Sequence, residues 1–487
     1  MVERWLVEPD VAGSSPAYRT IKMNKEKKLL IPSLPSGFQD RWGKTLSLKK
    51  KLLKVIEGNF INYGYSALET SPMELSSNIG NSLAEDDSNP MADIFTFNEE
   101  GKEISLRYDL SNPLARFYAQ NFQELPNPYK RFQISDVFRR EKQGNGRWKS
   151  FGQCDSDIIG KFNSAQANSE LCNLIVSTLT KCGLNKDQFV VNISNRKIVQ
   201  GLMDQLKITD EKQKQKVLRA IDKLGKPGFG ISGVQQLLTE KRTDDSGAVT
   251  IGAKLSADQA SEIVNFLKIK ELSQLKSSLK NTLSEEGIRE TEDLLKVLSY
   301  GEYADMVKFD PSKIRGLDIY TGFIVETNLT FDVKNPKGKV IDPGSICSGG
   351  EYLVSKFKGE DFLGSGISIG IDRLVFCLEQ LSQIQVDENK PVIVCIMDEK
   401  FLPQYYEILK LLRENNINSE IFLDYKKNLG KQLQFADRKS LPLAVICGSD
   451  EFKENTITIK NLLGVKGENN QVTVPKEKLI DEIKKFL

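Results

Sequence analysis

The sequence predicts an α+β core built on a mixed, mainly antiparallel sheet, interrupted by a helical insertion and followed by a separate C-terminal α/β domain. Short β-like runs separated by Gly, Asn and Pro fill residues 66–160, and long Leu/Lys/Glu/Gln segments fill residues 195–299. Strands then alternate with helices from residue 391 to the end. Because 487 residues are too many for one compact core, we expect two or three domains.

Residues 1–22 fit neither a helical nor a strand period, and we expect them to form a non-native or disordered extension. One possible coding of residues 12–17 has the stem and loop of a tRNA T-arm. The hypothesis is that an adjacent tRNA gene is translated here and that the natural protein begins at Met23. An ordinary disordered tail is the alternative. An N-terminal peptide from the native source that starts at Met1 would exclude the tRNA hypothesis.

Residues 23–194 are expected to form the first part of the core. Apolar residues at helical spacing predict a helix over residues 44–63, which ends at Gly64. The following β-like runs predict an antiparallel sheet with connecting helices; they are ISLRYDL, YKRFQIS, DVFRRE and CDSDIIG. Residues 195–299 form the predicted helical insertion. Residues 300–384 complete a discontinuous core, and in GSGISIGIDRLVFCLEQL a strand runs into a helix.

Residues 385–487 predict a small α/β domain after the polar connector QIQVDENK. The expected elements alternate regularly along the chain. They are strand PVIVCIM, helix FLPQYYEILKLLREN, strand SEIFLDY, helix KQLQFADRKS, strand LPLAVICG, strand TITIK and helix KEKLIDEIKKFL.

The composition excludes several classes of function. The chain has no histidine, which rules out His-ligated zinc, Ser-His-Asp or Cys-His nucleophiles and an imidazole base. A formal charge of +2 leaves only local surfaces for nucleic acid. Seven scattered cysteines without a C-x-x-C pair are typical of a reduced compartment, and no apolar run spans a bilayer. We therefore expect a cytoplasmic protein with no membrane segment.

Four segments contain residues suited to phosphate and amino-acid chemistry. FRREKQGNGRWKSFGQCDSD would form two strands whose loop aims Arg139 and Arg147 at one site, and arginine's planar fork suits phosphate oxygens. A basic, solvated hairpin is the alternative. GSGISIGIDRL ends in Arg373, and its G-x-G-x-x-x-G spacing fits neither the dinucleotide fingerprint nor a P-loop. Taken alone it could be a strand packed closely under a helix.

LRYDLSNPLARF would place Asp109 and Ser111 on one strand face if the segment is extended, although a surface Arg–Asp pair is the usual explanation. RGLDIYTG holds Arg315, Asp318 and Tyr320 in an apolar strand between glycines. Charges in such a strand need partners or ligands.

In this order the segments resemble those of the class II aminoacyl-tRNA synthetases, and specifically the histidyl-tRNA synthetase family, over residues 30–487. GYSALETSP with Pro72 resembles the first class motif at the dimer interface, FRRE and its loop the second, and GSGISIGIDRL the third. RGLDIYTG and the GGEY of residues 349–352 resemble the two histidine-specific signatures. The combination is specific, whereas each piece alone is weak.

The resemblance implies that ATP binds with Mg²⁺ bridging its phosphates, although it names no protein ligand for the metal. It implies Arg139 on the α-phosphate and Arg315 bracing that phosphate and the attacking carboxylate, as the catalytic pair. The remaining nucleotide contacts it implies are Arg147 and Arg373 on the outer phosphates, Glu141 on the adenine amino group and Phe151 stacked on the adenine ring.

For L-histidine, the resemblance implies that Asp109, Ser111 and Gln153 hold the ammonium and carboxylate ends, with Leu110 in the same binding set. Asp157 and the hydroxyl of Tyr320 would bond the two imidazole nitrogens. Ile319 and Tyr352 would line the pocket. Such a site rejects analogues that leave its polar groups unpaired.

Some positions depart from the family pattern. Ile319 stands where a second aromatic is usual. Glu351 replaces an arginine, and no aspartate follows Tyr352, so we assign Glu351 no role. Asp109 and Asp157 stand where many members have glutamate, which keeps the acceptor.

The resemblance also implies a homodimer and tRNA(His) as partner, with the C-terminal domain binding the anticodon and the insertion clamping the acceptor arm. The basic cluster of Lys426, Lys427 and Lys431 is better explained as a solvated face than as an RNA contact.

The first alternative is a catalytically silent paralogue that regulates a histidine-biosynthetic ATP phosphoribosyltransferase. Such paralogues lack the anticodon domain and lose the arginines, both of which are present here. A class II synthetase for another amino acid is the second alternative, and RGLDIYTG argues against it. A class I synthetase is excluded, since its H-I-G-H signature needs histidine.

Overall fold

The computed structural model describes residues 31–79, 94–140, 148–225, 229–243, 249–314, 319–354, 362–381, 390–464 and 470–487. The predicted N-terminal extension, residues 1–22, lies outside these ranges.

Within these ranges the larger part of the chain, which precedes the C-terminal domain, is organised around one eight-stranded sheet. In sheet order its strands are β1 (Ser66–Ala67), β5 (Tyr129–Phe138), β6 (Ser150–Gly160), β15 (Leu363–Gly370), β14 (Cys347–Leu353), β11 (Tyr320–Leu329), β7 (Phe189–Asn195) and β10 (Val307–Phe309). The edge pairs β1–β5 and β7–β10 are parallel, whereas the inner pairs are antiparallel. The predicted mixed, mainly antiparallel sheet is thus confirmed.

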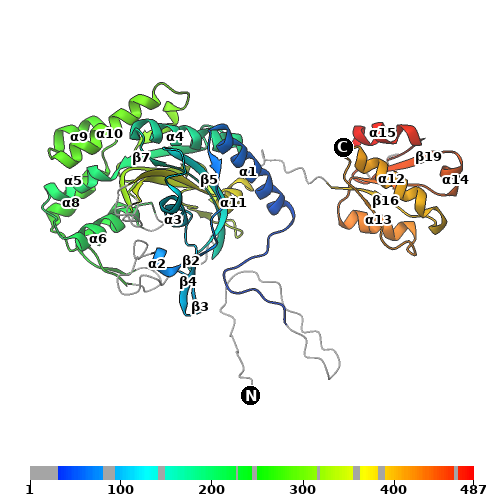
Figure 1. Cartoon of the computed structure of the whole chain (residues 1–487), viewed down its shortest axis with the longest axis horizontal. Coiled ribbons are helices and arrows are strands. Elements are labelled where there is room, and N and C mark those ends of the chain that lie inside the picture. Colours follow the sequence, from blue (N-terminus) through cyan, green and yellow to red (C-terminus); the bar gives the residue numbers. More distant parts are fainter. Residues whose placement is uncertain are drawn as a thin grey trace, which may run out of the picture.

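Helices cover the two faces of this sheet (Figure 1). On one face lie α1 (Gly43–Asn62), α4 (Ser164–Lys181) and α11 (Ile371–Leu378). The buried side chains of α1 recur every four residues, at Leu48, Leu52, Ile56 and Phe60, so the helix presents one apolar stripe to the core. The other face is only partly covered, by α3 (Ser111–Asn121), whose Leu114 packs with Tyr352 of β14. This leaves part of that face for a site.

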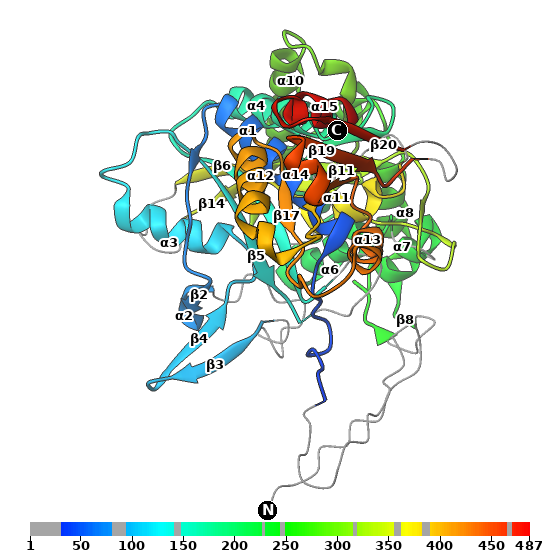
Figure 2. The same ribbon diagram turned by 90° about the vertical axis from the view of Figure 1, so that its right-hand side faces the viewer.

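A small three-stranded sheet projects from the catalytic part, as both views show (Figure 2). It consists of β2 (Met73–Leu75), β4 (Lys102–Leu106) and β3 (Thr96–Glu99), and α2 (Ser76–Ile79) follows β2. Met73, Leu75 and Phe97 are 49%, 44% and 39% exposed on it. Large apolar side chains gathered on a projecting element are typical of a contact surface.

The insertion is helical and has its own core. Its elements are α5 (Arg196–Gln205), α6 (Glu211–Asp222), α7 (Gly230–Thr239), α8 (Ala257–Leu267), α9 (Leu272–Ser278), α10 (Thr282–Leu298) and the hairpin β8 (Arg242–Thr243) and β9 (Val249–Thr250). Side-chain caps explain several helix starts: Asp210 before α6, Ser256 before α8 and Asn281 before α10 each accept a backbone N–H. A buried cluster that includes Ile198, Ile221 and Ile263 unites these helices.

A short 3-10 helix, η1 (Ala304–Met306), leads from the insertion back into β10. The two-stranded ribbon of β12 (Val333–Lys334) and β13 (Val340–Ile341) lies between β11 and β14 in the chain. The chain therefore rejoins the large sheet after the insertion. The boundaries of the insertion at 194/195 and 299/300 stay a prediction.

The C-terminal domain has a mixed sheet in the order β17-β16-β18-β19-β20. Its elements are β16 (Val392–Val394), η3 (Glu399–Phe401), α12 (Leu402–Glu414), β17 (Ser419–Ile421), α13 (Leu429–Arg438), β18 (Leu443–Ile446), α14 (Ser449–Lys453), β19 (Thr456–Asn461), β20 (Gln471–Pro475), η4 (Lys476–Lys478) and α15 (Leu479–Phe486). The expected alternation is present. The sequence did not predict α14 or β20, since each is only five residues long.

Two local expectations in the core need correction. Residues 107–111 are not an extended strand, because β4 ends at Leu106 and α3 begins at Ser111. Asp109 instead accepts the backbone N–H of Asn112 and so favours a turn before the helix. YKRFQIS and DVFRRE are also not separate strands, since β5 runs unbroken from Tyr129 to Phe138.

Two further features concern the cysteines and the helices. The seven cysteines are free and buried. In the described parts of the chain, no helix combines the length and apolarity that crossing a membrane requires.

Candidate active site

The uncovered face of the large sheet carries a row of polar side chains from four adjacent strands. Arg131 of β5 lies opposite Asp157 of β6, and Asp157 lies opposite Gly366 of β15. Gly364 of β15 lies opposite Tyr352 of β14. Because alternate residues of a strand share a face, Gln153 and Asp155 point to the same side as Asp157. The opposite residues, such as Cys154 and Ile158, point into the helix-covered core.

Asp157 is the centre of this row. It is 2% exposed, and its Oδ2 lies 2.7 Å from Nη2 of the fully buried Arg131. Its Oδ1 accepts a 2.6 Å hydrogen bond from the Tyr352 hydroxyl. Burial raises the pKa of Asp157, while Arg131 and the Tyr352 hydroxyl oppose that shift. Burial, followed by the charge of Asp157, raises the pKa of Tyr352. The cluster is a buried carboxylate held by one cation and one hydroxyl.

Glycines make room above this carboxylate. A Cβ at Gly366 would lie 2.0 Å from Asp157 Oδ1, and one at Gly364 would lie 2.6 Å from the ring of Tyr352. A Cβ at Gly350 would lie 2.8 Å from the ring of Tyr320. Side chains at these three positions would therefore displace the polar groups of the pocket.

Several buried polar atoms in the row have no hydrogen-bond partner among the described residues. They are Nε and Nη1 of Arg131, Oε1 of Gln153 and Oδ1 of Asp155. Burial raises the pKa of Asp155 to about 7, while Arg131 acts to lower it and Asp157 to raise it. Buried polar groups are normally hydrogen-bonded, so unpartnered ones gathered on one sheet face favour a polar ligand. The donors and acceptors here suit a small, charged molecule.

The predicted histidine-binding residues come together around this row to different degrees. Asp157 and Tyr352 are in direct contact, and Gln153 Nε2 donates to Ser368 Oγ at 2.9 Å. Tyr320 starts β11 opposite Tyr352, and the half-buried Ile319 precedes it. The hydroxyl that bonds Asp157 is that of Tyr352.

The segment before α3 supplies the remaining predicted contacts to the amino acid. Both oxygens of Asp109 accept hydrogen bonds from Asn112, at 2.9 and 3.0 Å. The backbone carbonyl of Leu110 accepts one from Arg131 Nη2 at 3.3 Å. Ser111 is the first residue of α3 and is half-buried. Leu110 thus joins this segment to the buried carboxylate.

A half-buried arginine stands at the end of β5. The guanidinium carbon of Arg139 lies 4.3 Å from the ring centroid of Tyr108 and 5.2 Å from that of Phe151. Its Nε donates to the backbone carbonyl of Tyr108 at 3.1 Å. Arg373 of α11 donates to the carbonyl of Ser345. Arg139 and Phe151 are therefore together, as the predicted nucleotide site requires.

Asp372 of α11 holds the backbone next to Phe151. It accepts from the backbone N–H of Gly152 at 2.6 Å and from Lys49 Nζ at 2.9 Å. Arg41 Nε lies 3.0 Å from the same carboxylate. These contacts tie the start of α11 to β6 and α1.

Three predicted site residues, Glu141, Arg147 and Arg315, lie outside the described residues, as does Asp318. Their placement stays a prediction. Glu351 is described: it is buried, and its Oε2 accepts the Phe323 N–H at 3.3 Å. Since Glu351 and Tyr352 are adjacent in β14, Glu351 points to the opposite face of the sheet, away from the site.

Sequence reasoning did not identify Arg131, Asp155 or Tyr108. A signal for Arg131 existed, because a cation inside the apolar strand YKRFQIS needs a buried partner and CDSDIIG offers two carboxylates. Which carboxylate pairs with it depends on the β5–β6 register.

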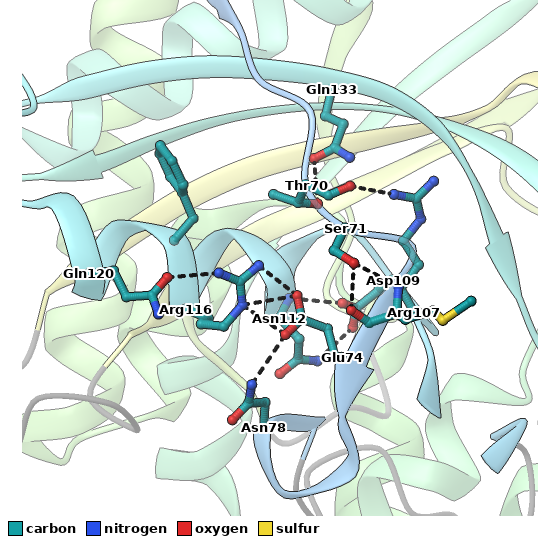
Figure 3. A network of polar contacts seen from close by, with 12 residues as sticks. Thr70, Ser71, Glu74, Asn78, Arg107, Asp109, Asn112, Arg116, Gln120 and Gln133 are labelled. Carbon is teal, nitrogen blue, oxygen red and sulfur yellow. Dashed lines mark hydrogen bonds and ion pairs between the residues drawn. The ribbon is translucent and has the colours of Figure 1, made fainter. Parts of the chain in front are cut away.

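Figure 3 shows the polar network beside this site, where the segment after β1 meets α3. Arg116 of α3 binds both oxygens of Glu74, with contacts of 2.7 to 3.0 Å, and Asn78 Nδ2 donates to Glu74 at 3.2 Å. Thr70 donates to Gln133 of β5 at 3.1 Å. The first-motif segment is thus bonded to the elements that carry the site.

The comparisons with known proteins agree with this arrangement. Residues 37–374 match the family described as histidyl-tRNA synthetase, and residues 390–486 match the anticodon binding domain family. A histidine–tRNA ligase from Pelagibacter ubique (strain HTCC1062) is 67% identical over 467 residues, which cover 96% of this chain and all of that protein.

Solved structures give the same fold. The histidyl-tRNA synthetase of Nostoc sp. PCC 7120 has a TM-score of 0.73 and 28% identity, covering 93% of this chain and 99% of that one. A Bacillus halodurans protein described as an ATP phosphoribosyltransferase regulatory subunit/histidyl-tRNA synthetase has a TM-score of 0.66 at 20% identity, over 85% and 97% of the two chains, and shares the fold. From its sequence matches over nearly the whole chain, this protein belongs to the histidyl-tRNA synthetase family.

Proposed function

We propose that this chain is a histidine–tRNA ligase. It activates L-histidine with ATP to histidyl-adenylate, releases pyrophosphate, and transfers the histidyl group to the 3'-terminal adenosine of tRNA(His), releasing AMP. The observation that carries the proposal is the buried Asp157–Arg131–Tyr352 cluster beneath three glycines, in a chain of this family. The regulatory paralogue is not favoured, since the chain has both the anticodon-binding domain and its arginines.

The imidazole of the substrate binds on the sheet face that carries Asp157 and these glycines. Asp157 accepts a hydrogen bond from one ring nitrogen, and the Tyr320 hydroxyl serves the other. Tyr352 holds Asp157 in place, and Ile319 lines the wall. The unpartnered Oε1 of Gln153 supports its role as an acceptor for the α-ammonium group.

Asp109 and Ser111 bind the remaining polar groups at the ammonium and carboxylate end, and Leu110 closes the segment between them. These roles are supported by the position of the segment, whose Leu110 carbonyl meets Arg131. Because both ends of the amino acid meet fixed groups, its carboxylate oxygen is directed towards the nucleotide.

A carboxylate oxygen of histidine attacks the α-phosphorus of ATP. The bond between the α-phosphorus and the oxygen that bridges it to the β-phosphate breaks, and pyrophosphate leaves. Arg139 and Arg315 stabilise the charge that develops on the α-phosphate oxygens, so the protein supplies positioning and charge rather than covalent chemistry. Arg147 and Arg373 hold the outer phosphates. Phe151 stacks on the adenine, and Glu141 accepts from its amino group.

Mg²⁺ enters as part of the substrate MgATP. No cluster of three or more Asp, Glu or Cys side chains suited to a metal occurs among the described residues. Mg²⁺ prefers oxygen ligands and is commonly held by substrate phosphates. The ion neutralises charge on the leaving pyrophosphate.

The C-terminal domain binds the anticodon of tRNA(His). Leu423 is 90% exposed, Tyr425 40% and Phe435 38%, beside Lys426 and Lys431 in the chain. Exposed rings with adjacent cations suit splayed, stacked bases and their phosphates. The helical insertion clamps the acceptor arm.

The protein works as a homodimer in the cytoplasm. Support for the dimer comes from the projecting β2–β4–β3 sheet with its exposed Met73, Leu75 and Phe97. Leu75→Glu places a charge on this apolar surface and is expected to give monomers in light scattering.

The decisive experiment is amino-acid-dependent ATP–pyrophosphate exchange with all twenty amino acids. We expect exchange with histidine alone, and its loss in Arg315→Ala. Histidine binding without any exchange would point to the regulatory paralogue instead. Exchange with another amino acid would exclude the proposed specificity.

A further inference from the structure

We propose that Arg107 is a positioning residue for adenylate formation, whose guanidinium fixes the segment 107–110 on which the histidine and nucleotide halves of the site both depend. The inference rests on the proposed function and adds a residue to it that touches neither substrate.

Arg107 is a buried cation whose guanidinium donates hydrogen bonds to backbone carbonyls. It is 7% exposed; its Nε donates to the carbonyl of Asp136 at 2.7 Å and its Nη1 to that of Thr70 at 3.0 Å. No carboxylate lies within ion-pair distance of it among the described residues. Thr70 belongs to the first-motif segment, and Figure 3 shows its bond to Arg107. Asp136 belongs to β5, so one planar group joins two elements.

The backbone of Arg107 joins the same two elements. Its N–H donates to the carbonyl of Pro72 at 3.0 Å, and its carbonyl accepts the N–H of Phe138 at 3.0 Å. Four hydrogen bonds therefore fix one residue between the first-motif segment and the end of β5. Any shift of the side chain moves the residues that follow it in the chain.

The next three residues each contact a different part of the site. The ring and the carbonyl of Tyr108 hold Arg139. In the proposed reaction Arg139 binds the α-phosphate. Asp109 is the acceptor proposed for the α-ammonium group. The carbonyl of Leu110 bonds Arg131, the ion-pair partner of Asp157. A single anchor thus positions groups that meet ATP, the ammonium group and the imidazole.

Chemistry distinguishes this role from ordinary packing. Burial lowers the pKa of Arg107, and the charges of Asp136 and Glu69 oppose that shift from beyond ion-pair distance. An apolar side chain would fill the space without burying a charge. What an arginine adds is a rigid fork that bonds two carbonyls in fixed directions. Lysine has the same charge but one nitrogen, so it can reach only one of the two carbonyls.

The test compares Arg107→Lys with Asn59→Ser in histidine-dependent pyrophosphate exchange, together with melting temperature and subunit mass. Asn59 is equally buried and joins α1 to α4 through Thr178 at 2.8 Å, on the face of the sheet away from the site. We expect Arg107→Lys to lower kcat/KM for both histidine and ATP about 10²-fold, as a displacement near 1 Å does. Asn59→Ser is expected to lower the melting temperature while its kinetic constants stay within about twofold.

Two results would overturn the inference: kinetic constants of Arg107→Lys within about twofold of wild type, or losses no greater than those of Asn59→Ser at a matched melting temperature. If Arg107→Lys does not fold, Arg107→Met decides, because an apolar side chain fills the same space but bonds neither carbonyl. We then expect kcat/KM for both histidine and ATP to fall at least about tenfold, and constants within about twofold of wild type would overturn the inference. Wild-type protein without histidine-dependent exchange would refute the proposed function itself, which is a separate outcome.

Discussion

The two halves of the site are held in different ways. In the histidine half, Asp157, Arg131 and Tyr352 are almost fully buried and bond one another within a single sheet face. In the nucleotide half, Arg139 and Arg373 are half-buried and bond backbone carbonyls, and Arg139 also lies against two rings.

This difference suits the two tasks proposed for the sheet, which are the selection of histidine and the binding of ATP. Buried, mutually bonded charges have fixed positions, which suits discrimination among amino acids. Arginines on carbonyls can exchange those weak partners for phosphate oxygens, which bind them more strongly. We therefore expect changes in the first half to affect histidine selectively, and changes in the second to affect ATP.

Asp157→Asn should have the largest effect. It removes the negative charge of the acceptor proposed for the imidazole and breaks the buried ion pair with Arg131, which costs about 3–5 kcal/mol. We expect kcat/KM for histidine to fall at least about 10³-fold, while the KM for ATP changes less than about threefold. Pyrophosphate exchange at varied histidine and at varied ATP measures both. A loss of less than tenfold would contradict the role of Asp157.

Arg139→Lys should have the next largest effect, on the other half. Lysine keeps the charge but cannot lie flat between two rings or present a bidentate fork to the α-phosphate. We expect kcat to fall about 10²-fold with little change in the KM for histidine. The same exchange assay, run at saturating histidine, checks this. An equal loss of histidine affinity would mean that the two halves are not independent.

Much of the fold could be predicted from the sequence, because it depends on local periodicity. The α1 stripe, the β15–α11 junction and the C-terminal alternation follow from spacing alone. The strand pairing of β5 with β6 does not, so the partner of Arg131 could not be read from the sequence. The turn at Asp109 was missed because its side chain bonds the backbone and competes with an extended conformation.

For the site, the sequence predicted residue types better than their contacts. Asp157 and Tyr352 both belong to predicted segments, yet only the β14–β15–β6 register shows that the Tyr352 hydroxyl reaches Asp157. Asp155 was missed because the effect of burial on its carboxyl depends on tertiary neighbours that no local pattern encodes.

Gly366→Ala tests the space in the histidine half. Its methyl group would lie 2.0 Å from Asp157 Oδ1, so the carboxylate must move. We expect the KM for histidine to rise about tenfold or more, with the ATP constants less affected. Gly370→Ala is the matched control on the same strand. The nearest atom to its added Cβ is the Cβ of Arg373 at 3.8 Å, which is an ordinary van der Waals contact. If both variants change the histidine KM alike, the cavity above Asp157 does not explain the effect.

The last expected effect is a pH dependence of the free energy of unfolding that arises in the histidine half. Burial raises the pKa of Asp155 from 3.8 to about 7, so between these values the folded protein holds a proton that the unfolded chain releases. Stability therefore falls as pH rises through this window. Asp155→Asn has no charge to bury. From pH 5 to pH 8 we expect wild type to lose up to roughly 2–3 kcal/mol relative to this variant.

Melting temperatures of the wild type, Asp155→Asn and Arg139→Lys across this pH range measure that effect. Arg139→Lys should follow the pH dependence of the wild type, because it leaves the buried row of β5 and β6 intact. A flat difference between wild type and Asp155→Asn would mean that Asp155 is already ionised at pH 5, with Arg131 compensating two carboxylates rather than one. The histidine half would then hold one more negative charge before its substrate arrives, and its attraction for the ammonium group would be correspondingly greater.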